Sequence, residues 1–137
     1  MSVRSREAHR MRVKSMAFVA YPGKDVAKLL AFYRDALGLR VDRAHPSEAD
    51  AQFVEFDLGN DQWFTLMPED FAGRPAGSGA GVVFEIDDID AALASVRAVA
   101  KSADEAPTDY GHCRMASFQD PEGNKVQLHQ HTGSAHT

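Results

Sequence analysis

The sequence predicts an α+β protein that contains two copies of one βαβββ module. A strand-like run, then an aspartate, then a helical pattern occurs at residues 18–32, and the same arrangement returns at residues 81–99. Aligning Asp25 with Asp88 sets the offset between the copies at 63 positions. A stretch rich in glycine and proline, residues 68–80, separates them. A repeat of this length is a whole supersecondary unit, so each copy is predicted to fold as one module.

The first module is predicted to begin with a strand at residues 15–21, which Pro22-Gly23 ends. Asp25 is a candidate N-cap for the following helix, because apolar residues recur after it at a spacing close to 3.6. Gly38 follows the last apolar position and suits a left-handed helix end. Three more strands are predicted at residues 39–43, 52–58 and 62–67, with a hairpin turn at Gly59-Asn60-Asp61.

The second module repeats this order. We expect a strand at residues 81–86, a helix from about residue 89 to 100, a loop at 104–111, and strands near 101–103, 113–118 and 125–130. The turn at Asp120–Asn124 matches the one at Asp57–Asn60. The predicted organisation is therefore an N-terminal arm at 1–15, modules at 16–67 and 81–131, a linker at 68–80, and a disordered tail at 132–137.

Composition narrows the classes of function. The chain has 137 residues, of which 44% are hydrophobic, enough for a packed core. Its net charge of −5 gives no reason to expect nucleic acid as the partner, because phosphate binding needs a basic face. No apolar run is long enough to span a bilayer, and the first fourteen residues lack the apolar segment of a secretory signal, so we expect a cytoplasmic protein. The single cysteine, Cys113, excludes an intrachain disulfide.

Several motifs resemble those of the vicinal oxygen chelate superfamily, which includes glyoxalase, bleomycin-resistance and extradiol-dioxygenase relatives. The motifs are Asp25-Val26, Phe32-Tyr33, Leu37-Gly38-Leu39, and Phe118 together with Asp120–Asn124. The resemblance covers about residues 16–131. It implies tandem βαβββ modules that form curved mixed sheets around a cleft, with helices outside. It also implies a homodimer, because pairing covers the costly open faces and edges of such sheets.

Metal-dependent relatives place their ligands at the start of the first strand and in the last strand of each module. The corresponding residues here are Phe18, Gly81, Gln127, and either Trp63 or Thr65. A phenyl ring and a hydrogen atom supply no lone pair, and a neutral amide binds a cation weakly. We therefore predict that the usual metal site is absent and that no cofactor is bound.

Strand alternation predicts which side chains face the cleft. It assigns Gly81, Val83 and Glu85 to the cleft in one strand and Lys125, Gln127 and His129 in another. The result is an apolar, aromatic-lined small-molecule site. The loop before Arg114 is a candidate lid, with Arg114 available to hold an anion. The predicted ligand-binding residues are Phe18, Trp63, Thr65, Met67, Gly81, Val83, Arg114 and Gln127.

Three functions remain open on the sequence. The first is metal-free binding of a small apolar or aromatic molecule. The second is metal-independent acid-base catalysis, of lyase or isomerase type, by Glu85 and His129, because the first and last strands of a module are parallel neighbours. The third is a structural subunit that pairs with a different relative.

Overall fold

The structure is a computed structural model that describes residues 11–133. It contains two mixed sheets. The strands are β1 (Val19–Gly23), β2 (Arg40–His45), β3 (Phe53–Gly59), β4 (Gln62–Pro68), β5 (Val82–Glu85), β6 (Ser102–Ala103), β7 (Thr108–Asp109), β8 (Cys113–Gln119) and β9 (Lys125–His131). The first sheet has the order β1-β4-β3-β2, and the second has the order β5-β9-β8-β6 with β7 beside β8. In each sheet the first strand runs parallel to the last, and the remaining pairs are antiparallel.

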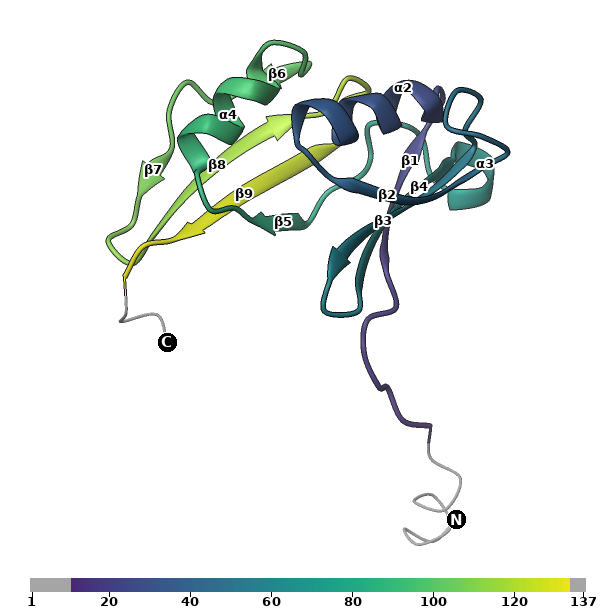
Figure 1. The fold of residues 1–137 in the computed structure, drawn as a ribbon, viewed down its shortest axis with the longest axis horizontal. Coiled ribbons are helices and arrows are strands. Elements are labelled where there is room, and N and C mark those ends of the chain that lie inside the picture. The colour runs from purple at the N-terminus through teal and green to yellow at the C-terminus, as the bar shows by residue number, and fades with distance from the viewer. Residues whose placement is uncertain (1–10, 134–137) are drawn as a thin grey trace, which may run out of the picture.

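The helices are α2 (Val26–Ala31), which continues into the π-helix η1 (Phe32–Ala36), the short α3 (Glu69–Ala72), and α4 (Ile89–Arg97). The side chains of Asp25 and Asp88 accept hydrogen bonds from the amides three residues on, at 3.1 Å each, and so cap α2 and α4. Figure 1 shows the sheets side by side, with α2 and α4 along the same side of the molecule. The predicted α+β class and the two curved βαβββ modules are confirmed.

Some predicted boundaries differ from the structure. The first strand begins at Val19 and continues through Pro22 and Gly23, which pair with Met67 and Pro68 of β4. The predicted break at Pro22 is wrong because β1 is an edge strand, where a missing N–H costs no sheet hydrogen bond. The predicted loop at 104–111 contains β7, and the predicted linker contains α3. The arm and tail predictions fall largely on residues 1–10 and 134–137, which lie outside the described residues.

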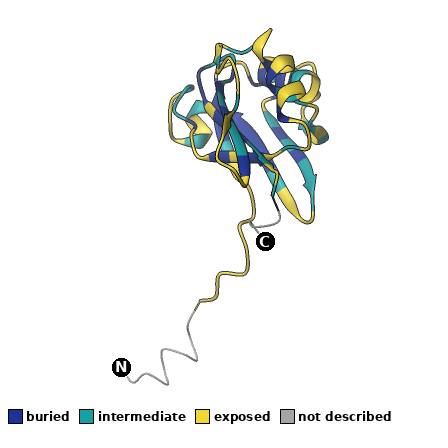
Figure 2. Cartoon of the chain, turned by 90° about the vertical axis from the view of Figure 1, so that its left-hand side faces the viewer, coloured by how far each residue is buried: buried dark blue, intermediate teal, exposed yellow. Residues whose placement is uncertain are grey.

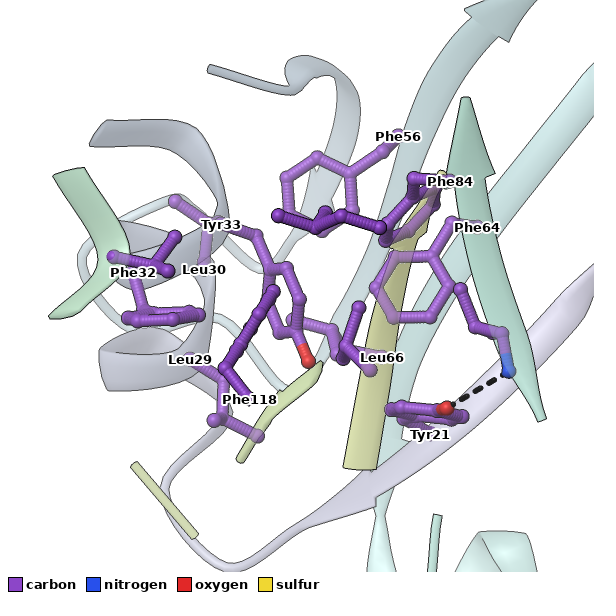
Figure 3. Close-up of a cluster of buried hydrophobic side chains, with 14 of the residues drawn as sticks. Tyr21, Leu29, Leu30, Phe32, Tyr33, Phe56, Phe64, Leu66, Phe84 and Phe118 are labelled. Atoms are coloured by element: carbon purple, nitrogen blue, oxygen red, sulfur yellow. Dashed lines mark hydrogen bonds between the residues drawn. The ribbon is translucent and has the colours of Figure 1, made fainter. Parts of the chain in front are cut away.

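One core joins the two modules. Side chains of both sheets and of α2, η1 and α4 form a single buried cluster. Figure 2 shows the buried residues, in dark blue, along the strands and helices. The ring centroids of Tyr33 and Phe64 are 5.0 Å apart. The ring centroids of Phe64 and Phe84, which belongs to the second module, are 5.4 Å apart. Figure 3 shows these rings together with Phe118, which contacts Phe32 at 5.8 Å. Since this chain of rings crosses from one sheet to the other, the modules share their hydrophobic stabilisation.

The turn at Asp120–Asn124 also connects the modules. Asp120 is fully buried, and its Oδ1 accepts from the amides of Glu122 and Asn124 at 2.9 and 3.0 Å. Its Oδ2 accepts from the Tyr33 hydroxyl at 2.8 Å. Burial, followed by the nearby Asp120 carboxylate, raises the pKa of Tyr33 well above its ordinary value, so the phenol remains a neutral donor. The turn therefore fixes the first module against the second.

Two further contacts hold the boundary between the modules. Asn124 Oδ1 accepts from the amides of Gly77 and Gly79 at 3.0 and 2.8 Å, which ties the linker to the second module. The Tyr21 hydroxyl donates to the carbonyl of Lys125 and accepts from the amide of Val82 at 3.1 Å (Figure 3). Within residues 11–133, no helix is both long and apolar enough to cross a membrane.

Candidate functional site

Each sheet packs one face against the helices and the shared core, and the second sheet leaves its other face open, whereas Thr65 and Met67 on the corresponding face of the first sheet are buried. In β5, Val82 and Phe84 are buried whereas Val83 and Glu85 are exposed. In β9, Val126 and Leu128 are buried and the residues between them are not. This alternation follows the predicted pattern. The open face of the second sheet therefore carries the side chains that the sequence assigned to a cleft.

A cavity of about 350 Å³ lies where β1, β4 and β5 approach each other. We call it the aromatic cavity. It is open to solvent, because the side chains on its two sides, Phe18 and Val83, are 53% and 46% exposed. Four predicted ligand-binding residues line it, Phe18, Trp63, Gly81 and Val83, together with Leu58 and Gln62 of the β3–β4 hairpin.

A second cavity, of about 660 Å³, lies over the second sheet near the start of β9. We call it the polar cavity. Gly81 lines both cavities, and Gln127, also predicted to bind ligand, lines the polar one. Gly81 has φ of +97°, and no heavy atom lies within 4 Å of where a Cβ would stand. The rest of the lining of the polar cavity is largely polar and includes Lys125, Ser117, Gln119, Ser102 and Asp104.

Three predicted ligand-binding residues lie elsewhere. Thr65 and Met67 are buried at 7% and 9% exposure and line neither cavity. The guanidinium of Arg114 forms two hydrogen bonds to Asp90 of α4, at 2.7 and 3.1 Å, and they raise its pKa. Arg114 is therefore on the helix side of β8, and the structure does not bring it together with the other candidates. Its position two residues before the buried Ala116 is the sequence signal for that side.

Glu85 and His129 are paired as expected for parallel neighbours. The His129 Nδ1 lies 2.6 Å from Glu85 Oε1, and Glu85 Oε2 accepts from the His131 amide at 2.9 Å. Burial would raise the pKa of Glu85, but these hydrogen bonds outweigh it and hold the pKa below its ordinary value. Glu85 lies two residues beyond Val83 on the same face, a distance of about 7 Å. Neither Glu85 nor His129 lines the aromatic or the polar cavity.

The side chains at the family's ligand positions do not fit a metal ion. Phe18 offers a phenyl ring, Gly81 has no side chain, and Gln127 offers a neutral amide. The two alternatives in β4 are the indole of Trp63 and the buried hydroxyl of Thr65. The hydroxyl of Thr65 is directed to the carbonyl of Val19, 3.4 Å away. Among the described residues, no three His, Cys, Asp or Glu side chains are grouped so that they would hold an ion.

Sequence reasoning missed part of the aromatic cavity. Leu58 and Gln62 line it because the β3–β4 hairpin brings them beside Trp63 and the start of β5. Asn60 and Asp61 both have positive φ in that turn, at 53° and 58°. The predicted hairpin was the available signal, since residues that flank a tight turn stay close to the strand ends.

Comparison with known proteins agrees with this geometry. Residues 15–128 match the family model of the Glyoxalase/Bleomycin resistance protein/Dioxygenase superfamily, and the chain belongs to that family. No curated protein matches the chain.

Solved structures share the fold over most of their length. TnmS3, an antibiotic binding protein from Streptomyces sp. CB03234, is 25% identical over 90% of this chain and 100% of its own, with a TM-score of 0.71. A glyoxalase/bleomycin resistance protein from the same organism is 27% identical over 85% and 100%, with a TM-score of 0.68. Lactoylglutathione lyase from Agrobacterium tumefaciens, at 22% identity over 87% and 95% and a TM-score of 0.67, shares the fold.

Proposed function

We propose that this protein binds a small apolar or aromatic molecule without a metal ion and sequesters it. The observation that carries the proposal is the aromatic cavity, a solvent-open space of about 350 Å³ that Trp63, Phe18, Gly81 and Val83 line. That volume is in the range of small-molecule sites, and rings bind planar ligands through stacking and apolar burial. The likeness to an antibiotic binding protein supports the same class of ligand.

The side chains at the metal positions support binding without an ion. Holding a transition metal requires imidazole, thiolate or carboxylate groups, and the positions that would supply them carry Phe18, Gly81 and Gln127. The same residues leave room for a ligand. The space beside Gly81 lacks any side chain, and Phe18 adds an exposed ring.

We also propose that two copies pair through their open sheet faces and that the protein works in the cytoplasm. Exposed apolar side chains on the open side, such as Phe18 and Val83, support pairing, because burying them is favourable. The cytoplasmic assignment fits a chain whose only cysteine, Cys113, has no partner for an intrachain disulfide. A purified chain that stays monomeric alone would favour the subunit of a heteromeric relative instead.

A second candidate function is acid-base catalysis of lyase or isomerase type by Glu85 and His129. Their contact of 2.6 Å is the observation that favours it, because a carboxylate can orient a histidine for proton transfer. The Glu85 side chain is 60% exposed, which weakens the electrostatic coupling of the pair. Because Glu85 and His129 line neither cavity, acid-base catalysis is the second candidate.

The experiment that tests the proposal uses protein treated with a chelator. We expect compounds from a panel of small planar aromatic molecules to bind saturably, with one-to-one stoichiometry per cavity, and to be recovered chemically unchanged by mass spectrometry. Absence of saturable binding across the panel would contradict sequestration. Conversion of a bound compound that His129→Ala abolishes, while Trp63→Ala only weakens binding, would favour the enzyme.

A further inference from the structure

We propose that the ligand is an aromatic compound that carries an anionic group, and that Lys125 binds this group. The proposal rests on the proposed function and adds the chemical class of the ligand. It starts from the observation that Gly81 lines both the aromatic and the polar cavity. A ligand seated beside Trp63 can therefore extend into the polar cavity over a residue that has no side chain.

Lys125 is the charged residue next to that passage. Val82 and Val126 are partners in the parallel pair of β5 and β9, so Gly81 and Lys125, each one residue earlier, are lateral neighbours. Adjacent strands are about 4.8 Å apart. Both positions belong to the open face, and no heavy atom, the Lys125 side chain included, lies within 4 Å of where a Cβ on Gly81 would stand, so the space over Gly81 is free for a ligand. The ammonium group is thus within reach of a ligand that covers Gly81.

The partners of the polar groups leave Lys125 and Gln127 available. Within residues 11–133, Lys125 forms no ion pair, and neither its ammonium nor the Gln127 amide makes a side-chain hydrogen bond. Other lining groups are already used. Ser102 donates to Gln119 at 2.8 Å, and the Asp104 carboxylate accepts from the Ser117 amide at 2.8 Å. An anion on the ligand would therefore gain charge-assisted hydrogen bonds without breaking existing ones.

Two features of the protein oppose an anion at Lys125, the carboxylate of Asp104 and the negative net charge. Asp104 lines the polar cavity, but it is bound to Ser117 of β8, two strands away from β5, whereas Lys125 is one strand away. The net charge of −5 repels anions at long range. Salt screens such repulsion beyond about 8 Å at physiological ionic strength, so the contact with Lys125 dominates close to the site.

The test compares two aromatic probes of matched shape. N-phenylnaphthylamine is neutral, and anilinonaphthalene sulfonate adds a sulfonate to the same ring framework. We expect Lys125→Met to weaken binding of the sulfonate about tenfold and to leave binding of the neutral probe within about twofold. Lys28→Met, on α2 at the helix side, is the matched control and is expected to change neither. Trp63→Ala is expected to weaken both, and raised salt is expected to weaken the sulfonate alone.

The possible failures are distinguishable. If the neutral probe does not bind, the proposed function is wrong and this inference falls with it. A second case is that the neutral probe binds in a Trp63-dependent manner, but Lys125→Met leaves sulfonate binding unchanged or weakens binding of both probes equally. In that case the proposed function stands, and only the inference that Lys125 binds an anionic group is wrong. One-for-one displacement of the sulfonate by the neutral probe, with unchanged circular dichroism of every variant, ensures that the signal comes from the cavity and not from loosened protein.

Discussion

At the scale of single residues, the turn at Asp120–Asn124 is the feature with the most consequences. Within the turn, the Asp120 side chain accepts a hydrogen bond from the amide of Glu122. The same side chain also accepts from Tyr33, 87 positions earlier. That contact was not predictable from local pattern, because only the packing of one module on the other brings the two side chains together.

The Asp120 network yields the first prediction. Asp120→Ala leaves the Tyr33 hydroxyl and two amides without acceptors in a buried site, so we expect a loss of about 3 kcal/mol or more in the free energy of unfolding. Tyr33→Phe removes one donor while Asn124 still contacts Asp120, so we expect a loss of about 1 kcal/mol. Urea denaturation measures both. Equal losses of stability in the two variants would contradict the hydrogen-bond network around Asp120.

The second residue-scale prediction concerns acid stability. Hydrogen bonds from His131 and His129 hold the pKa of Glu85 below its value of 4.5 in the unfolded chain. The unfolded chain therefore binds more protons in this range, and the contribution of Glu85 is present above pH 4.5 and is lost as the pH falls through the folded pKa. We expect wild-type stability to fall more steeply than that of Glu85→Gln as the pH falls below 4.5. If the stabilities of the wild type and of Glu85→Gln, measured by denaturation, fall in parallel as the pH is lowered, the Glu85–His129 pair contributes nothing to stability.

At the scale of elements, local sequence signals predicted most helices and strands. The strands that were misplaced or missed have a common cause, which is that their limits depend on pairing with another strand. Asp25 and Gly38 marked the two ends of the first helical segment, and Gly38 has the positive φ of 80° expected there. The 3.6-residue spacing did not predict that the α-helix ends at Ala31 and continues as the π-helix η1. The first strand was misplaced because its limits depend on where β4 runs beside it. β7 is two residues long and exists only through pairing with β8, so its own sequence carries no signal.

The linker provides the element-scale prediction. A Cβ on Gly79 would stand 2.8 Å from Asn124 Oδ1 and from the Tyr21 ring, so we expect Gly79→Ala to cost about 2–3 kcal/mol through overpacking. Gly38→Ala is the control, because its Cβ would meet nothing within 4 Å and only the positive φ is strained. That variant should lose about 1 kcal/mol. Thermal or urea unfolding checks the order, and a larger loss for Gly38→Ala would contradict it.

At the scale of the whole molecule, the repeat predicted the architecture and strand alternation predicted the open face of the second sheet. The candidate site was predicted only in part. Phe18, Trp63, Gly81 and Val83 meet in one cavity, but which elements surround that cavity depends on the packing between the modules. Arg114 was assigned by its nearness to a loop, and the pleat of β8 places it on the other side.

Pairing of two chains is the prediction at this scale. We expect analytical ultracentrifugation to give twice the mass of one chain, and Val83→Asp to shift the protein toward monomer because it puts a charge on the open face. Val99→Asp is the matched control, since Val99 is similarly exposed, at 54% against 46%, and follows α4 on the helix side. A wild-type chain that is monomeric at all concentrations would exclude the homodimer.

The most direct test of the account uses Trp63, the only tryptophan in the chain, as the reporter of its own cavity. Chelator-treated protein is titrated with N-phenylnaphthylamine while tryptophan fluorescence is recorded. We predict saturable quenching that reaches a fixed stoichiometry and is the same with or without added Zn²⁺ or Ni²⁺. Quenching that is absent, or that appears only when metal is supplied, would contradict metal-free binding beside Trp63.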